Sequence, residues 1–507
     1  MEHGLFDERE VELLRSALAG YTVESVHELL GLAGQAALQR GDLDGVARHL
    51  RGDDRLPTLV RLFLLGAEVP EAAARSAVAP LPLESACAAG LLAASAGSVR
   101  ARLDLRPYAE QATARPGSPS AGSDWWVVSD FGADVRSGPL APDHVLGIGS
   151  ASLTLAQATP RLPAGRALDI GTGCGIQALH LSRHCAEVVA TDVSARALRL
   201  AATTAALSGQ TWELRNGSLL EPVAGEQFDL IVANPPFVVS AGTGGYDYRD
   251  SGLAGDRVCE ALVRGLPEAL RPGGTAQLLA NWVITAEQSW DERLHGWLAG
   301  SGCDAWAWQR EVVPPGDYVS LWLRDAGERP GTPRWSELYN AWLDWFDAAG
   351  IAAIGMGLIT LWRSDSAAPA VVCEDLPQPV EQPVGPELPA WLARRRWLAS
   401  TPPPGLLSAT LRPAPGLVRE RAELLGPDGW QEASARLRQT HGLRWELEVD
   451  DAIAALVAGC DGATPLQQVV AVLAAALDRP VDEIGAAVDP VVRDLVGRGF
   501  LIPAALR

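Results

Sequence analysis

The residue types best suited to chemistry begin where a short apolar run meets a series of glycines. The run ends at Asp169, and Gly171, Gly173 and Gly175 follow it at alternate positions. Glycines so placed let the backbone turn tightly and approach a ligand closely, because no side chain stands in the way. A helix is expected to begin at Ile176. The segment therefore predicts a strand, a tight turn and a helix N-terminus that bind a nucleotide-like ligand.

A second carboxylate, Asp192, closes the next predicted strand, where it can accept hydrogen bonds from both hydroxyls of a ribose. A dinucleotide-binding turn has its third glycine where this chain has Ile176. Asp169 also adds a carboxylate at the turn, which would repel a pyrophosphate but suits the ammonium group of an amino-acid moiety. The pattern favours S-adenosyl-L-methionine (SAM) over a dinucleotide, and a structural turn without a ligand is the alternative.

The segment after the third predicted strand offers contacts for adenine. Ser218 stands where many SAM enzymes have an acidic residue for the adenine amino group, and its hydroxyl can make one hydrogen bond there. Val193 and Leu219 are the candidates to enclose the adenine ring between apolar faces. Ser218 can equally be a turn residue, so both interpretations stay open.

The motif Asn234-Pro235-Pro236-Phe237 follows another predicted strand. Two prolines that end a buried strand are unusual, because proline removes hydrogen-bond donors from the sheet. They fix the backbone so that the side-chain carbonyl of Asn234 and the main-chain carbonyl of Pro235 can both accept from a planar NH2 group. Its nitrogen would then face the sulfonium methyl for in-line displacement. Phe237 offers a flat face on which an amide or a base can stack, and a purely structural turn is the alternative.

Together, Asp169–Gly175, Asp192 and Asn234–Phe237 resemble the class I SAM-dependent methyltransferases with an Asn-Pro-Pro-(Phe/Tyr) signature. This group includes release-factor glutamine, ribosomal RNA guanine-N2 and adenine-N6 N-methyltransferases. The resemblance covers roughly residues 140–324. It implies SAM as cofactor and methyl transfer to a planar nitrogen, which Asn234 would bind and on which Phe237 would stack.

The resemblance does not fix the methyl acceptor. Glutamine methyltransferases usually have Tyr where this chain has Phe237, and the guanine enzymes usually continue with His where this chain has Val238. The chain therefore predicts an N-methyltransferase acting on a protein amide or a nucleobase exocyclic amine. A small-molecule or peptide natural-product methyltransferase and a non-catalytic SAM-binding scaffold are the alternatives. The net charge of -20 disfavours nucleic acid as the partner without excluding it.

A glycine-rich segment, residues 240–256, directly follows the Asn-Pro-Pro-Phe motif. It contains Tyr246, Tyr248 and Arg249, which we predict to bind the substrate as part of a lid. A plain solvent loop would not need these residues. Upstream, the polar loop 143–150 precedes the glycine turn and either folds over the ligand or simply connects two elements.

Strand-like and helix-like segments alternate from residue 166 to 323, which predicts an α/β, Rossmann-like, doubly wound and mostly parallel sheet. Ligands bind outside the carboxyl ends of strands in such sheets, where all these motifs fall. The predicted strands are 167–170, 188–192, 211–215, 228–233, 275–280 and 318–323, and the predicted helices are 176–183, 195–208, 257–270 and 286–299.

The rest of the chain is expected to form flanking domains. The expected divisions are a helical N-terminal domain (1–98), a β-hairpin with a connecting loop and helix (99–160), the methyltransferase domain (161–330), a sheet-extending helix and strand (331–374) and an α+β C-terminal domain (375–507), winged-helix-like at 443–507. The N-terminus lacks a signal peptide pattern and the seven cysteines occur singly, so we expect a cytoplasmic protein with reduced thiols and no membrane contact.

No metal site is expected. His180 and His184 stand four residues apart on a predicted helix, but no third ligand is evident, and two surface histidines are the simpler interpretation. The many tryptophans between 306 and 345 are expected in a core or an interface, with an aromatic groove for a ligand as the alternative.

Overall fold

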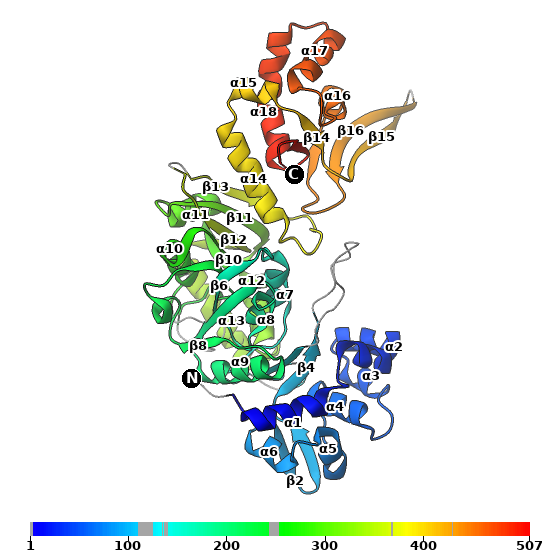
Figure 1. Cartoon of the computed structure of the whole chain (residues 1–507), viewed down its shortest axis with the longest axis vertical. Coiled ribbons are helices and arrows are strands. Elements are labelled where there is room, and N and C mark those ends of the chain that lie inside the picture. Colours follow the sequence, from blue (N-terminus) through cyan, green and yellow to red (C-terminus); the bar gives the residue numbers. More distant parts are fainter. Residues whose placement is uncertain are drawn as a thin grey trace. The chain divides into compact units, whose positions relative to one another are not determined.

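The computed structural model describes residues 4–109, 125–133, 135, 140–242, 253–366, 369–427 and 429–506 (Figure 1). The chain divides into two compact units. The first contains Met1–Ala156 and Leu162–Leu376, and the second contains Gln157–Arg161 and Pro377–Arg507. The predicted boundary at 330/331 falls inside the first unit.

An eight-stranded sheet forms the centre of the first unit, in the order β13-β11-β12-β10-β9-β6-β7-β8. All neighbouring pairs are parallel except those of β12, which runs antiparallel to both β10 and β11. This confirms the predicted Rossmann-like, mostly parallel α/β fold. The strands are β6 (Ala164–Ile170), β7 (Cys185–Asp192), β8 (Glu213–Asn216), β9 (Phe228–Ala233), β10 (Leu270–Thr285), β11 (Cys303–Val313), β12 (Ile351–Arg363) and β13 (Val371–Asp375).

The strand order reverses between β6 and β9. The chain runs outward from β6 through β7 to β8, and then returns so that β9 pairs with the other side of β6. Such a reversal leaves a crevice at the carboxyl ends of the two strands, because their connections leave in opposite directions. The glycine turn follows β6 and the Asn-Pro-Pro-Phe motif follows β9. The topology thus brings the two predicted motifs to one crevice.

Seven helices of the described chain connect these strands or precede them: α7 (Ser150–Ala158), α8 (Ile176–Leu181), α9 (Ala195–Leu207), α10 (Arg257–Ala269), α11 (Trp290–Leu298), α12 (Pro315–Asp325) and α13 (Pro333–Ala348). Ser194 caps α9 by accepting from the Ala197 N–H, and Ser289 caps α11 in a reciprocal capping box with Glu292. These polar caps fix where the helices begin, next to the strand ends that carry the site.

The predicted strand 318–323 was wrong, because these residues lie in helix α12. Buried Tyr318, Val319 and Leu323 lie on one face at helical spacing, and Pro315 stands in the first turn, where proline is tolerated. The sixth strand of this sheet along the chain is instead β11, which no prediction covered. The strand expected to extend the sheet is β12, and it lies inside the sheet between β10 and β11.

The N-terminal part packs on the catalytic sheet's helices. It contains helices and a small sheet in the order β1-β3-β2, and one apolar core runs from Phe6 to Leu207. The predicted hairpin is confirmed where β4 pairs antiparallel with β5. The elements are α1 (Glu8–Leu18), α2 (Val23–Gln39), α3 (Leu43–Ala47), α4 (Arg55–Phe63), β1 (Val69–Pro70), α5 (Glu71–Val78), α6 (Leu83–Ala88), β2 (Leu92–Ser95), β3 (Ser98–Ala101), β4 (Asp104–Tyr108) and β5 (Trp125–Ser129).

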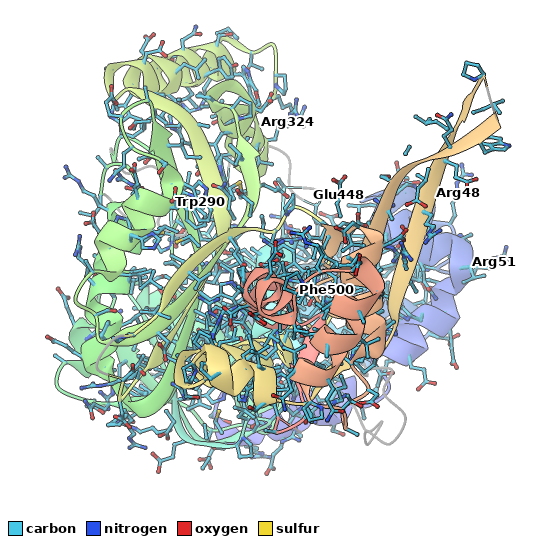
Figure 2. The ribbon with its side chains drawn as sticks, turned by 90° about the horizontal axis from the view of Figure 1, so that it is seen from above. Arg48, Arg51, Trp290, Arg324, Glu448 and Phe500 are labelled. Atoms are coloured by element: carbon cyan, nitrogen blue, oxygen red, sulfur yellow. The ribbon has the colours of Figure 1, made fainter. Side chains whose placement is uncertain are left out.

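The second unit has its own core, in which Phe500 is fully buried (Figure 2). The segment 443–507, predicted to be winged-helix-like, contains three helices, but β18 pairs with the upstream strand β14 and not with a wing strand. Its elements are α14 (Glu387–Ser400), α15 (Pro403–Ser408), β14 (Leu411–Pro413), β15 (Leu417–Gly426), β16 (Gly429–Gln439), β17 (Glu446–Glu448), α16 (Asp451–Gly459), α17 (Leu466–Leu477), α18 (Val481–Gly497) and β18 (Leu501–Pro503). In neither unit does a described helix have the length and apolarity needed to cross a membrane.

Candidate active site

The glycine turn after β6 has the left-handed backbone that its sequence demands. Gly171, Gly173 and Gly175 have φ values of 69°, 56° and 92°, which side chains of L-residues disfavour. The N–H groups of Gly171 and Thr172 both donate to the carbonyl of Thr191, at 2.9 Å. These bonds tie the turn to the end of β7. The turn is therefore a fixed feature of the first two strands.

The second and third glycines have different roles. A Cβ on Gly175 would lie 2.6 Å from the ring of Trp212, whose Nε1 donates to Ser182 at 2.8 Å. Gly175 is thus required by packing as well as by its φ angle. A Cβ on Gly173 would meet nothing within 4 Å. The backbone at Gly173 therefore borders open space, as a ligand-binding turn needs.

Asp169 is fully buried at the end of β6. Its Oδ2 accepts hydrogen bonds from the Thr172 hydroxyl at 2.7 Å and the Ala178 N–H at 3.1 Å. Its Oδ1 is buried without a hydrogen-bond partner among the described residues. Burial raises the pKa of Asp169 to about 7 against those two hydrogen bonds, and the negative charge of Asp192 adds to the rise. A cation at Oδ1 would satisfy this carboxylate, so the site fits an ammonium group.

Asp192 links the glycine turn to the second strand. Its Oδ2 accepts from the N–H of Gly173 and its Oδ1 from the N–H of Ser194, both at 2.9 Å. Each carboxylate oxygen can accept more than one hydrogen bond, which suits a group that binds ribose hydroxyls. Asn216 was missed in the sequence, yet its Nδ2 donates to the main-chain carbonyls of Asp192 and Val193 at 3.1 and 3.0 Å. Its position at the end of β8 was the available signal.

The three adenine candidates lie around the ends of β7 and β8. Val193 is 56% exposed and directly follows Asp192. Ser218 is exposed, and its carbonyl accepts the Glu221 N–H at 2.9 Å, which gives it a turn role too. Leu219 has a φ of 50° and packs partly against the core beneath β6 and β9. Their neighbourhood suits the predicted adenine contacts, which stay a prediction.

The Asn-Pro-Pro-Phe motif leaves β9 next to the glycine turn. A Cβ on Gly171 would lie 3.7 Å from the main-chain oxygen of Asn234, so the two motifs are in contact distance. The side-chain Oδ1 of Asn234 is buried and has no hydrogen-bond partner among the described residues. Pro235 is buried and Pro236 is half-buried, which holds the chain at this point. The residue that carries this unpartnered side-chain oxygen therefore leaves β9 beside the predicted cofactor turn.

Helices α12 and α13 supply aromatic neighbours that sequence analysis did not assign to the site. The ring of Trp322 meets that of Phe237 edge-on, with 6.0 Å between centroids. Beyond Phe237, the Val239 N–H donates to the Tyr318 hydroxyl at 2.9 Å, and Trp342 Nε1 donates to the Val239 carbonyl at 3.1 Å. The available signal was the group of tryptophans between 306 and 345, for which the sequence predicts a core or an interface, with an aromatic groove for a ligand as the alternative.

The predicted substrate residues Tyr246, Tyr248 and Arg249 lie outside the described residues. The described ends of this segment are joined, because the Gly255 N–H donates to the Ser240 carbonyl at 2.8 Å in an antiparallel bridge. The segment thus leaves and re-enters the fold at one place, directly after the Asn-Pro-Pro-Phe motif.

The loop 143–150 is anchored to the sheet's helices through a buried carboxylate. Asp130 pairs with Arg196 on α9 at 2.6 and 2.7 Å, and it accepts the Val145 N–H at 2.9 Å. Burial opposes ionisation of Asp130, but Arg196 and the Val145 N–H outweigh it, so the pKa of Asp130 is lowered. This anchoring fixes the start of the loop; whether it covers a ligand stays a prediction.

The prediction that His180 lies on the surface was wrong. His180 is only 4% exposed, and its Nε2 lies 2.6 Å from the Tyr108 hydroxyl. Trp125 also meets the imidazole ring edge-on, at 5.5 Å between centroids. His180 thus joins α8 to the hairpin β4–β5. Among the described residues, no group of three or more His, Cys, Asp or Glu side chains could hold a metal ion.

Comparison with known families identifies three segments. The family model of the methyltransferase small domain matches residues 146–297. Residues 18–102 and 389–503 match two families that are described as domains of unknown function. The first match contains the glycine turn, Asp192 and the Asn-Pro-Pro-Phe motif, so the three motifs belong to a single catalytic domain.

Two named groups of enzymes have similar sequences. The release factor glutamine methyltransferase of Deinococcus radiodurans is 39% identical over 150 residues, which are 27% of this chain and 54% of that protein. That of Xylella fastidiosa is 36% identical over 139 residues, 25% of this chain and 48% of that protein. The ribosomal RNA small subunit methyltransferase C of Alcanivorax borkumensis is 31% identical over 128 residues, which are 25% of this chain and 36% of that protein. The chain spans about half the length of the glutamine methyltransferases it matches.

Solved structures are more distantly similar. The YcgJ protein from Bacillus subtilis has a TM-score of 0.29 and 16% identity, covering 43% of this chain and 99% of its own. A phosphoethanolamine N-methyltransferase of Haemonchus contortus, solved with S-adenosylhomocysteine, has a TM-score of 0.28 and 13% identity. The match covers 42% of this chain and 52% of that one. The fold assignment rests on the strand order and not on these scores. Residues 146–297 therefore match the methyltransferase small domain, and the similar sequences support a class I, SAM-dependent methyltransferase of the group that includes the release factor glutamine and ribosomal RNA small-subunit methyltransferases.

Proposed function

We propose that this chain is a SAM-dependent N-methyltransferase that transfers a methyl group to a planar nitrogen by in-line displacement. The acceptor nitrogen belongs to a protein glutamine amide or to the exocyclic amine of a nucleobase. One observation carries the proposal above all. Asn234 Oδ1 is buried without a described partner, and the main chain of Asn234 lies beside the glycine turn.

The residues at the crevice fit SAM on the donor side. Asp169 Oδ1 would pair with the ammonium group, and Asp192 would accept the ribose hydroxyls. The open backbone of Gly173 would let the cofactor lie against the turn, with adenine near Val193, Ser218 and Leu219. When bound, SAM supplies an electrophilic methyl group on a positively charged sulfur.

The residues on the acceptor side hold and aim the nitrogen. Asn234 Oδ1 and the Pro235 carbonyl would accept the two N–H bonds of a planar NH2 group, which leaves its lone pair directed at the methyl group. Phe237 would stack on the plane of the amide or base. A strong base is not required, because the acidity of the nitrogen rises as its new bond forms and the proton can leave to water. Asn234, Pro235, Pro236 and Phe237 are the proposed catalytic group.

Charge favours a protein amide among the possible acceptors. The net charge of -20 repels a phosphate backbone, whereas it presents no such barrier to a protein. The named relatives include enzymes whose names specify a release factor glutamine and enzymes whose names specify ribosomal RNA, so both classes belong in the test. Tyr246, Tyr248 and Arg249 are the proposed acceptor contacts from the segment after the motif, and the proposed location of the enzyme is the cytoplasm.

A second candidate is methylation of a small molecule or peptide. Trp322, half-buried and edge-on to Phe237, supports it, because an aromatic corner suits an apolar ligand. A non-catalytic SAM-binding scaffold is disfavoured. Such a protein would not need the buried, unsatisfied Asn234 Oδ1, which costs about 1–3 kcal/mol when nothing binds it.

The test separates cofactor binding from transfer. We expect wild-type protein to bind SAM in isothermal titration, and Asn234→Ala to keep the dissociation constant within about twofold, since the proposed contacts of Asn234 are to the acceptor. We expect the same variant to lose at least about 100-fold in transfer of labelled methyl groups to a bacterial lysate. Phe237→Tyr is the matched control, because it retains a stacking ring. Failure to bind millimolar SAM, or full activity of Asn234→Ala, would overturn the proposal.

A further inference from the structure

Helices α12 and α13 form an aromatic insertion between β11 and β12. On the side facing the sheet, Tyr318 contacts the rings of Trp322, Trp342 and Phe346, with centroid separations of 6.0, 6.5 and 6.2 Å. The same apolar cluster includes Val238 and Val239, which follow the Asn-Pro-Pro-Phe motif. The insertion therefore packs against the chain that leaves the proposed acceptor site.

Tyr318 has a polar role in this otherwise apolar cluster. It is fully buried, and its hydroxyl oxygen accepts two hydrogen bonds at 2.9 Å. One comes from the Val239 N–H and the other from Nδ2 of Asn281, a buried residue of β10. Burial raises the pKa of Tyr318, so the phenol is neutral. One oxygen atom thus joins the insertion, a strand of the sheet and the segment after the motif.

Val239 is held from both of its backbone groups. Its N–H donates to Tyr318, and its carbonyl accepts from Trp342 Nε1 at 3.1 Å. Val239 lies two residues beyond Phe237, whose ring is in turn bordered by Trp322. The side chains of Tyr318, Trp322 and Trp342 in the insertion therefore all contact the segment 237–239. Apolar packing alone would not need directed hydrogen bonds to this peptide.

We propose that Tyr318 is a positioning residue for methyl transfer, which acts through Val239 to hold Asn234 and Phe237 in register with the methyl donor. This inference rests on the proposed N-methyltransferase function. Methyl transfer depends on a near-linear approach, so a displacement of about 1 Å can cost about 100-fold in rate. Pro235 and Pro236 restrict the backbone within the motif, while Tyr318 and Trp342 hold the backbone just after it, at Val239.

Tyr318→Phe tests the proposal, because it keeps the ring and removes only the oxygen. Thr204→Val is the matched control: its buried hydroxyl also accepts a single backbone N–H, from Val128 at 3.1 Å, and it joins α9 to β5 away from the motif. Both variants leave one buried backbone N–H without its acceptor, and Tyr318→Phe also leaves Nδ2 of Asn281 without its acceptor. We therefore expect a larger loss of melting temperature in Tyr318→Phe than in Thr204→Val, with SAM dissociation constants of both variants within about twofold of wild type.

The two variants should differ in turnover and in local protection. With labelled SAM and the protein fraction of a bacterial lysate, we expect Tyr318→Phe to lose about 10-fold to 100-fold at saturating SAM, and Thr204→Val to stay within about twofold. Hydrogen exchange of the full chain should show faster exchange of the peptide that contains Val239 in Tyr318→Phe alone. Trp342→Phe should reproduce both effects, and the double variant should lose little more, because both contacts act on the same residue, Val239.

The outcomes distinguish this inference from the proposed function. An active wild type with Tyr318→Phe as fast as Thr204→Val overturns the positioning role and leaves the function standing. A wild type that transfers no label to protein, RNA, DNA or small-molecule fractions overturns the function, and the positioning role with it. In that case, unchanged exchange at Val239 in Tyr318→Phe would show that the hydrogen bond does not hold the segment at all.

Discussion

Two buried oxygen atoms without described hydrogen-bond partners mark the site at the scale of single residues, Asp169 Oδ1 and Asn234 Oδ1. Asp169 lies near the end of β6, and Asn234 directly follows the neighbouring strand β9. Buried polar atoms are almost always hydrogen-bonded in native proteins, so an exception calls for a ligand or another cause. A cation at the first atom and an N–H donor at the second would satisfy both. Those are the two groups that a methyl donor with an ammonium group and a planar nitrogen acceptor would bring.

The pKa of Asp169 predicts how SAM affinity depends on pH. The free carboxyl has a pKa of about 7, mainly because of burial, whereas a bound ammonium group would favour the ionised form. Binding should therefore release a proton, and affinity should rise by about 10-fold from pH 5.5 to 7, below the pH at which an α-amino group loses its own proton. Titration calorimetry in buffers of different ionisation enthalpy measures this release.

Asp169→Asn is the control for that prediction. It should weaken binding at pH 7 and abolish the slope with pH, and a slope that persists in this variant would assign the proton to another group. The stability of the ligand-free protein should change with pH in the direction opposite to that of SAM affinity. Because the folded pKa lies above the ordinary value of 3.8, the ligand-free protein should lose stability as pH rises from about 4 to about 7.

At the scale of elements, the strand–turn–helix unit β6–α8 depends on glycine for two reasons. Gly175 has a φ of 92°, and a Cβ there would lie 2.6 Å from the ring of Trp212. We expect Gly175→Ala to destabilise the first unit by about 2–3 kcal/mol and to weaken SAM binding, because the turn cannot relax without moving this ring. Thermal unfolding with and without SAM measures both effects.

Gly296→Ala is the matched control for Gly175→Ala. Gly296 lies within α11, and a Cβ there would meet nothing within 4 Å. Alanine is the better helix former, so this change should leave stability unchanged or raise it by up to about 1 kcal/mol. Equal losses in the two variants would mean that neither the φ angle nor the Trp212 ring restricts the turn.

The elements that carry the cofactor motifs could be predicted from the sequence. Strands β6, β7 and β9 are largely apolar runs, and the polar residues Asp169, Asp192 and Asn234 lie within one residue of their ends. The change from apolar to polar residues therefore indicates where each strand ends. The acceptor-side helix was mispredicted because Tyr318–Leu323 is rich in β-formers and nearly all apolar, which hides the helical period. Tyr318 and Trp342 meet Val239 only through tertiary packing across long sequence separations, which no local pattern records.

At the scale of the whole molecule, the chain combines a catalytic unit with a second compact unit. The predicted α+β end of the chain matches the described elements in kind, whereas the start that was predicted to be helical also contains the small sheet β1-β3-β2. The long hairpin β15–β16 was not predicted, and it carries exposed Leu424, Leu425 and Trp430 near its turn. Alternating charged residues in both strands obscured their apolar pattern. The winged-helix-like character of 443–507 and the domain boundaries remain predictions.

Because the chain has two compact units, SAM should raise the stability of one unit and leave the other unchanged. All proposed SAM contacts lie in the first unit, so SAM at 100 times its dissociation constant should stabilise that unit by about 2.7 kcal/mol. The second unit has a separate core and should unfold at an unchanged temperature. Differential scanning calorimetry of the full chain measures this, with S-adenosylhomocysteine as a second ligand. A single transition that SAM shifts as a whole would contradict independent unfolding of the units.

The most direct test of the central claim is where the methyl group goes. Wild type and Asn234→Ala should be incubated with methyl-labelled SAM and separated protein, RNA, DNA and small-molecule fractions of a bacterial lysate, and the labelled products identified by mass spectrometry. We predict an N-methylated planar nitrogen, with a glutamine amide of a protein as the favoured product, formed by wild type and lost in Asn234→Ala. Label on oxygen, carbon or sulfur, or equal labelling by the two proteins, would contradict it.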